Sequence, residues 1–156
     1  LLRVHAILSE KFVNKSRQGK YRQEKVGVFG KYGLVYLAAP VEILKVEMRD
    51  FCLGVQSLMS KKLSLEEVFY YAAQVHLVFA HIHPFVDGNG RVARVLEKWF
   101  LAAHLGENAW KISAEKFYWE NRAKYYQNLN LGVNYHELDY KKAMPFLLML
   151  PKALNA

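Results

Sequence analysis

The chain has 156 residues, 53% of them hydrophobic, and carries a formal net charge of +8. This length and composition fit one domain with a single core and exclude an intrinsically disordered segment. The single cysteine excludes an internal disulfide framework and is typical of a reducing compartment, so we expect a cytoplasmic protein. No apolar run reaches membrane-spanning length, and Lys and Arg are scattered along the chain. We therefore expect no membrane partner and no nucleic acid as the main ligand.

The first part of the chain predicts a helix, a loop and a β-hairpin. Apolar residues recur with helical spacing over residues 1–13, whereas residues 14–25 are polar and basic. Between Val26 and Ala38, two short apolar runs flank the sequence Gly30-Lys31-Tyr32-Gly33, which is typical of a hairpin turn. Pro40 then suits the first position of a helix.

Three long helices are predicted in the middle of the chain. Residues 41–59 have helical spacing, and Ser64-Leu65-Glu66-Glu67 is a capping box that starts a second helix running to Ile82. The third begins after a glycine-rich turn and ends at Gly106. Its apolar pattern predicts a buried stripe made of Val92, Val95, Leu96, Trp99, Phe100 and Ala103.

The last part of the chain predicts two more helices. We expect Ser113 to cap one that runs to about residue 129, and Asp139 to cap one that Pro145 bends and Pro151 ends. The whole pattern predicts a mainly α fold, a bundle of about seven helices with one small hairpin, in a single domain over residues 1–156. Because position 1 is not Met, we also expect an upstream segment.

The densest chemistry lies in the turn between the second and third long helices. His83 precedes Pro84, and a residue before proline is pushed out of the α region, so the helix should end near Ile82. A neutral imidazole there can accept a proton near pH 7. Phe85 is the apolar member of the turn, and we expect it to anchor the turn in the core.

The next residues favour an anion together with a metal ion. Asp87 offers a hard oxygen ligand suited to Mg²⁺, which prefers one or two carboxylates plus phosphate oxygens and water. Gly88 and Gly90 permit positive φ and a close approach of backbone N–H groups to a ligand, and Asn89 tolerates the same conformation. The following helix N-terminus attracts anions, and the helical spacing of Arg91 and Arg94 places them on one face, where they suit a polyphosphate.

Simpler interpretations exist for several of these residues. Asp87 could cap a helix or pair with Arg91, and Arg94 could form a surface ion pair. His81 and His83 form a His-x-His pattern that suggests a transition metal, but no third ligand lies close in the sequence. The other histidines are expected to be ordinary core or surface residues: His5, His76, His104 and His136.

Residues 83–94, here called the signature segment, read His-Pro-Phe-x-Asp-Gly-Asn-Gly-Arg-x-x-Arg. This pattern resembles the full signature of the Fic (filamentation induced by cAMP) family. The resemblance implies a Fic-type helical bundle and a protein adenylyltransferase. Such an enzyme transfers AMP from ATP to a Ser, Thr or Tyr hydroxyl of a target protein, with Mg²⁺ (or Mn²⁺) as cofactor and release of pyrophosphate.

The resemblance also implies a role for each signature residue. His83 would deprotonate the target hydroxyl, and Asp87 would hold Mg²⁺. Residues 88–90 would form an anion hole for the α- and β-phosphates, and Arg91 and Arg94 would bind the β- and γ-phosphates. A tyrosine-rich helix shapes the adenine pocket in the family, which places Tyr126 there.

The hairpin of residues 26–38 resembles the family's flap, and the preceding Gly19-Lys20-Tyr21-Arg22 resembles the segment that leads to it. The flap implies a protein target bound by strand addition, so that its hydroxyl faces the catalytic histidine. The residues expected to contact the target are Val26, Val28, Leu34, Val35 and Tyr36.

Two alternatives to AMP transfer remain open. The transferred group could be UMP, GMP, phosphocholine or a phosphoryl group, although Gly90 argues against the phosphoryl-transferring members, which carry Lys at that place. The domain could instead be a non-catalytic module whose basic flap binds an acidic partner. The intact set of catalytic side chains argues against that second alternative.

Many members carry an inhibitory helix with Ser or Thr, three residues, then Glu and Gly or Asn, whose Glu pairs with the second signature arginine, here Arg94. Glu120-Asn121 has the right ending, but Lys116 stands where Ser or Thr is needed. We therefore expect inhibition to come from an upstream segment or from an antitoxin-like partner protein.

Overall fold

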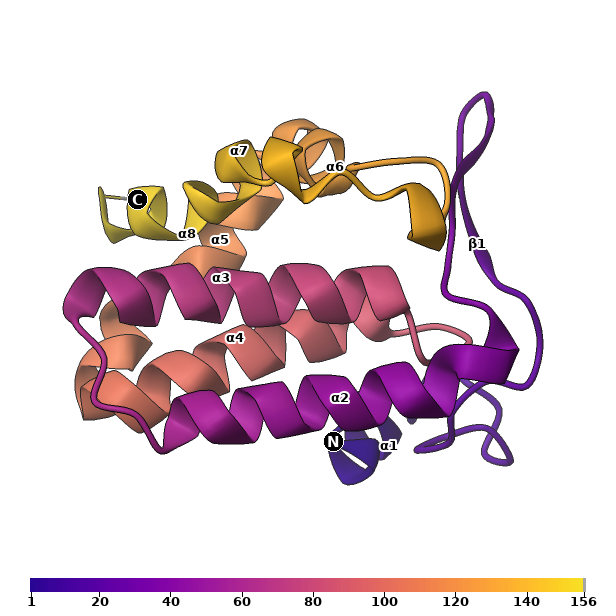
Figure 1. Ribbon diagram of the computed structural model, residues 1–156, viewed down its shortest axis with the longest axis horizontal. Helices are drawn as coiled ribbons and strands as arrows, with labels where there is room; N and C mark the ends of the chain where they lie inside the picture. The colour runs from indigo at the N-terminus through magenta and orange to yellow at the C-terminus, as the bar shows by residue number, and fades with distance from the viewer. Residues whose placement is uncertain (156) are drawn as a thin grey trace.

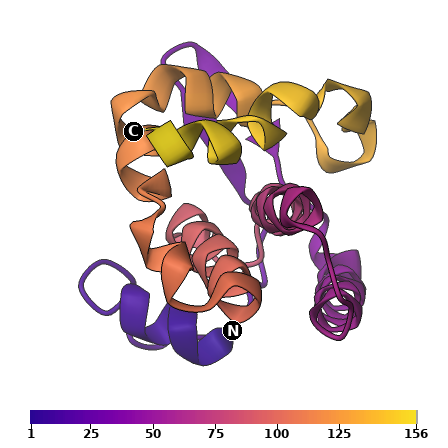
Figure 2. The same cartoon turned by 90° about the vertical axis from the view of Figure 1, so that its left-hand side faces the viewer.

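Three long helices lie side by side and support the rest of the molecule (Figures 1 and 2). The computed structural model describes residues 1–155. Helices α2 (Val41–Met59) and α3 (Leu65–Ile82) are joined by a short turn, and α4 (Asn89–Leu105) follows α3 after the signature turn. The capping box at Ser64 is confirmed, because Ser64 N–H donates to Glu67 Oε2 at 2.8 Å while the Ser64 side chain accepts from Glu67 N–H.

Shorter helices cover this layer on two sides. Helix α1 (Leu2–Leu8) packs against α4 from below in Figure 1. The C-terminal part lies above α3, and its helices are α5 (Ala114–Glu120), α6 (Arg122–Leu129), α7 (Met144–Leu147) and α8 (Met149–Lys152). A 3₁₀ helix at Gly106–Lys111 joins α4 to α5, two 3₁₀ turns at Tyr135–Glu137 and Tyr140–Lys142 lie between α6 and α7, and a last one at Ala153–Asn155 follows α8. Within residues 1–155, no helix combines the length and apolarity needed to cross a bilayer.

The core has two parts, and the second supports the signature segment. One lies between α3, α4 and the C-terminal helices. The other lies beneath the signature turn and consists of Ala39, Leu44, Met48, Phe79, Ile82, Phe85, Val92 and Ala93. Phe85 is fully buried there, so the expected anchoring of the turn is confirmed.

The hairpin is confirmed and projects away from the helices (Figure 1). Strands β1 (Gly27–Gly30) and β2 (Gly33–Leu37) pair antiparallel, with a bulge between Val28 and Phe29. Its tip is open to solvent, with Tyr32 93% exposed. Its base is tied to the body, because Leu37 N–H donates to the Val133 carbonyl at 2.7 Å.

Several predicted boundaries were wrong. The helix expected over residues 1–13 ends at Leu8. The helix expected from Ser113 to about residue 129 is broken at Asn121, which separates α5 from α6, and Ser113 makes no capping hydrogen bond with its side chain. Pro145 lies in the first turn of α7, which begins at Met144, instead of bending a helix, and Pro151 lies inside α8 instead of ending it.

The buried face of α4 was also predicted incorrectly. Trp99 is 47% exposed and Val95 is 39% exposed, whereas Glu97 is almost completely buried. The helix therefore presents to the core a face that includes a carboxylate. A prediction from hydrophobic spacing assigns a charged residue such as Glu97 to the surface. For this reason the predicted buried stripe was centred too close to Trp99.

Candidate active site

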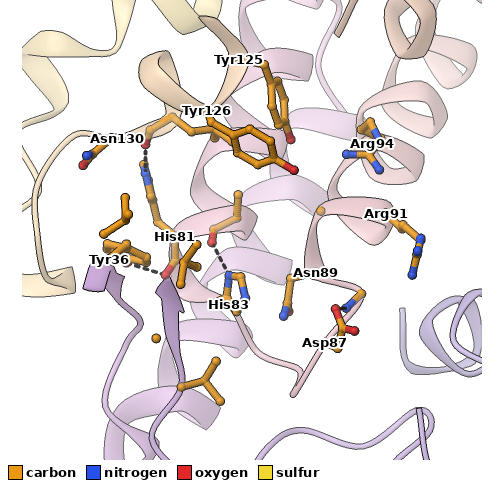
Figure 3. A pocket seen from close by; sticks show the side chains of 18 of the residues that line it. Tyr36, His81, His83, Asp87, Asn89, Arg91, Arg94, Tyr125, Tyr126 and Asn130 are labelled. Atoms are coloured by element: carbon orange, nitrogen blue, oxygen red, sulfur yellow. Dashed lines mark hydrogen bonds between the residues drawn. The ribbon is translucent and has the colours of Figure 1, made fainter. Parts of the chain in front are cut away.

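A cavity of about 480 Å³ lies between the hairpin, the signature segment and α6 (Figure 3). Its walls come from β1, β2, the end of α3, the start of α4, and α6. Among the residues expected to bind nucleotide, metal or target, those that line it are Val26, Val28, Val35, Tyr36, His83, Asp87, Gly88, Asn89, Gly90, Arg91, Arg94 and Tyr126. Leu34 does not line the cavity and lies on β2 with a side chain 45% exposed.

His83 stands at the end of α3 in a left-handed conformation, with φ 54° and ψ 57°. The helix ends at Ile82, as the following proline predicted. The Nδ1 atom of His83 lies 3.0 Å from the Ala80 carbonyl oxygen. Because a carbonyl can only accept, Nδ1 carries the hydrogen and Nε2 keeps a free lone pair. Burial lowers the pKa of His83 below its ordinary value, so the ring is neutral at pH 7 and can accept a proton through Nε2.

Asn89 closes the turn with its side chain. Its Oδ1 accepts from Phe85 N–H at 2.9 Å, and its Nδ2 donates to the Phe85 carbonyl at 2.8 Å. The residue is buried, so both hydrogen bonds form away from water. The Asn89 amide therefore helps to hold the turn, and its second Nδ2 hydrogen and its backbone N–H are left to meet an anion.

The N-terminus of α4 opens on the cavity without a side-chain cap. Its N-cap, Gly88, has φ 82°, a conformation that side chains rarely adopt, and an added Cβ would meet the Phe12 ring at 3.3 Å. Gly88 N–H donates to Asp87 Oδ1 at 2.6 Å. A carboxylate oxygen thus occupies a place where the helix N-terminus favours negative charge.

The two signature arginines point in different directions (Figure 3). The guanidinium of Arg91 stacks on Phe12, with its central carbon 3.9 Å from the ring centre. Arg94 lies toward Tyr125, and its charge opposes the burial that raises the pKa of Tyr125 to about 12. Within residues 1–155, neither the Asp87–Arg91 pair nor a surface pair of Arg94 is formed.

The chemistry of the cavity fits Mg²⁺ better than a transition metal. Asp87 is the acidic side chain among the lining residues. No cluster of three or more His, Cys, Asp or Glu capable of holding a metal occurs in the described part of the chain. His81 Nε2 instead lies 2.8 Å from the Leu129 carbonyl, and burial lowers its pKa to about 4. One carboxylate fits Mg²⁺, which completes its shell with phosphate oxygens and water.

Two supporting residues escaped the sequence interpretation. His5 was expected to be an ordinary core or surface residue. It is fully buried and stacks on Phe85 at 3.7 Å between ring centres. Its Nδ1 accepts from Gly19 N–H at 2.9 Å, so Nε2 donates to the Asp87 carbonyl at 3.0 Å. The second is Arg22, whose buried guanidinium donates to the His83 carbonyl at 2.8 Å. The segment Gly19-Lys20-Tyr21-Arg22 resembled the family, but no local pattern indicated that Arg22 would contact His83 or that His5 would contact Asp87, because both partners are distant in the chain.

A buried polar network lies behind Arg94. His76 Nε2 is 2.9 Å from the Tyr125 hydroxyl, and His76 Nδ1 is 2.8 Å from Glu97 Oε2. The same carboxylate oxygen accepts from the Tyr118 hydroxyl at 2.9 Å. The network joins α3, α4, α5 and α6, so it fixes the wall of the cavity on which Tyr125 lies.

Comparisons with known proteins agree on the family. The chain resembles a solved Fic family protein from Desulfovibrio desulfuricans G20, with 25% identity, a TM-score of 0.77, and coverage of 99% of this chain and 44% of that one. It also resembles a Fic domain containing signaling protein from Bacteroides thetaiotaomicron VPI-5482, with 20% identity, a TM-score of 0.67, and coverage of 98% and 63%. The chain thus spans less than two thirds of either protein. No curated protein matches it.

A model of the Fic/DOC family matches residues 1–101, which include the whole signature segment. The family resemblance seen in the signature segment is therefore confirmed, and it extends over most of the sequence. The mainly helical fold with its two-stranded hairpin also agrees with the solved relatives. The protein belongs to the Fic/DOC family.

Proposed function

We propose that the protein is a Mg²⁺-dependent adenylyltransferase that moves AMP from ATP to a Ser, Thr or Tyr hydroxyl of a target protein. One observation carries the proposal: a single cavity joins a neutral histidine, a carboxylate, an uncapped helix N-terminus and two arginines, and the hairpin lines its other side. These are the groups that nucleotidyl transfer to a protein hydroxyl requires.

The nucleotide would lie with its phosphates at the N-terminus of α4. Backbone N–H groups of residues 88–90 would bind the α- and β-phosphates, and Arg91 and Arg94 would bind the outer phosphates. Mg²⁺ held by Asp87 would supply charge neutralisation for the phosphates. Tyr126, 54% exposed on α6, lies beside this position and offers a ring for the adenine.

The hydroxyl would transfer its proton to Nε2 of His83 while its oxygen attacks the α-phosphorus. The bond between the α-phosphorus and the bridging oxygen breaks, and pyrophosphate leaves with that electron pair. The resulting imidazolium keeps its Nδ1 hydrogen bond to the Ala80 carbonyl. The ring therefore accepts the proton without having to reorient.

The target would bind along the hairpin. Among the described residues, β1 pairs only with β2, so its outer edge offers free N–H and C=O groups to an added strand. Val26, Val28 and Val35 line the cavity from this side, so an added strand would lie opposite His83.

A label-transfer assay tests the proposal. The protein and a lysate would be incubated with each α-labelled nucleotide and, separately, with γ-labelled ATP. We expect label on protein from α-labelled ATP only, and a signal at least about a hundredfold lower with His83→Ala. Label from another α-labelled nucleotide would change the donor, and label from γ-labelled ATP would indicate phosphoryl transfer. Intact nucleotide binding with no label from any donor would indicate a binding module and contradict the proposal.

A further inference from the structure

Arg22 is a buried cation that does not line the cavity. Its residue is only 3% exposed, and none of the ion pairs formed within residues 1–155 includes it. A buried guanidinium is unfavourable unless all its N–H groups find acceptors. Here the acceptors are four backbone carbonyls, those of Glu24, Ala39, Ile82 and His83.

The four carbonyls belong to three separate segments of the chain. Glu24 lies just before β1, Ala39 follows β2, and Ile82 and His83 form the end of α3. Arg22 Nε donates to the His83 carbonyl at 2.8 Å, and Arg22 Nη1 donates to the Glu24 carbonyl at 2.9 Å. The backbone N–H of Arg22 adds a bond to the Pro84 carbonyl at 3.0 Å. One residue thus connects both ends of the flap to the residues around the histidine.

These bonds also account for the unusual backbone of His83. The last carbonyls of a helix have no partner within the helix. His83 is left-handed, which is unfavourable for a residue with a side chain. The guanidinium satisfies the carbonyl of that residue and the one before it, so the left-handed turn leaves no acceptor unpaired.

We propose that Arg22 is a positioning residue for the transfer reaction: it fixes the backbone of His83 and holds the flap at a set distance from His83 Nε2. This inference rests on the proposed role of His83 as the base. It assigns Arg22 no contact with nucleotide or target. Its loss should therefore lower turnover while nucleotide affinity is retained.

The test compares Arg22→Lys and Arg22→Met with Arg17→Met. Lysine keeps the charge, but its compact ammonium cannot reach four carbonyls in three segments. Arg17 lies in the same loop, is half exposed and pairs with the Glu24 side chain, so its substitution controls for lost charge. We expect kcat to fall about 10- to 100-fold in both Arg22 variants, as misplaced reacting groups do, with the Kd for ATP within about twofold of the parent. Arg17→Met should match the parent.

A second measurement, the titration of His83 by NMR, does not depend on whether the protein transfers label. The pKa of His83 is lowered by burial and by Arg22, and raised by the Ala80 carbonyl and by Asp87; the neighbouring His81 is neutral at pH 7. Nitrogen-15 NMR of the histidine rings should show a higher His83 pKa in Arg22→Met, with partial loss of the Nδ1–H tautomer. Arg22→Lys should keep the pKa closer to that of the parent.

The outcomes separate the two proposals. If the parent transfers no label but the NMR change occurs in Arg22→Met, the proposed function fails, and what stands is only that Arg22 fixes the His83 backbone and ring. If Arg22→Met does not fold, Arg22→Lys decides. A folded Arg22→Lys protein with parental kcat overturns the inference.

Discussion

The signature turn and the flap line the same cavity, yet they are constructed in opposite ways. Much of the turn is buried, and hydrogen bonds hold it from several directions: Asn89 bonds to the Phe85 backbone, His5 to the Asp87 carbonyl and Arg22 to the His83 carbonyl. The flap is exposed, and Phe29 at its outer end is 73% exposed. Only its base is held: the Tyr36 hydroxyl donates to the His81 carbonyl at 2.6 Å, Leu37 N–H donates to the Val133 carbonyl, and Arg22 donates to the carbonyls of Glu24 and Ala39.

This difference separates two tasks. Groups that act on phosphate must be held rigidly, because small displacements lower the rate steeply. A surface that adds a strand must instead leave its backbone groups unpaired until the partner arrives. Substitutions in the turn should therefore affect chemistry with any target, and substitutions in the flap should affect target modification alone.

The largest expected effect is that of His83→Ala. We expect transfer to fall by about 10²- to 10⁴-fold, the usual contribution of a general base, while calorimetry shows unchanged ATP binding, since His83 acts on the acceptor. His136→Ala, at an exposed histidine, is the matched control. Parental activity in His83→Ala would remove the histidine from the mechanism.

The next effect is that of Asp87→Ala. We expect about a hundredfold slower transfer, comparable with the loss of other preorganised electrostatic groups, and a parent reaction that stops in EDTA and resumes with Mg²⁺ or Mn²⁺. Asp139→Ala, which affects only a 3₁₀ turn, is the control. Transfer at the parental rate in EDTA would exclude a metal-binding role for Asp87.

Val35→Pro tests the flap side of the comparison. Proline removes an N–H and disturbs the strand, so we expect about tenfold less target modification by loss of strand addition. ATP binding should remain. Val35→Ala, which keeps the N–H, is the control. If target modification is unchanged in the proline variant, the target does not bind through the flap.

The smallest effect concerns stability and pH. Burial lowers the folded-state pKa of His81 to about 4, against about 6.5 in the unfolded chain. The unfolded state therefore binds the proton first, and stability is lost as pH falls from 6.5 toward 4. We expect His81 to account for about 1 kcal/mol of loss between pH 7.5 and 5.5. Urea unfolding at both pH values should show a smaller loss in His81→Gln; an equal loss would contradict this assignment.

Local chemistry in the sequence predicted much of this arrangement. Pro84 located the end of α3 and the exit position of His83, and Ser64 located its start, because each signal acts within a few residues. The charged and glycine residues of the signature segment predicted the cavity residues. The ligand of the cavity stays a prediction, because the side-chain pattern indicates which residues meet but not which molecule they bind.

The rest depended on partners far apart in the chain. Arg22 meets His83 across 61 positions, and His5 meets Asp87 across 82. A buried Glu97 likewise requires His76 and Tyr118 from other helices. A sequence pattern assigns charged residues to the surface, so it cannot indicate which of them the fold will enclose.

The left-handed backbone of His83 places a histidine where glycine or asparagine is the usual occupant. Under the proposed mechanism, the residue that best suits the backbone at this position differs from the residue that catalysis requires. A library randomised at this position and selected only for resistance to heat should drift toward glycine or asparagine, because both relieve the backbone. The same library selected for label transfer should retain histidine. The difference in thermal stability between the variants recovered in the two selections would measure the stability cost of histidine at this position.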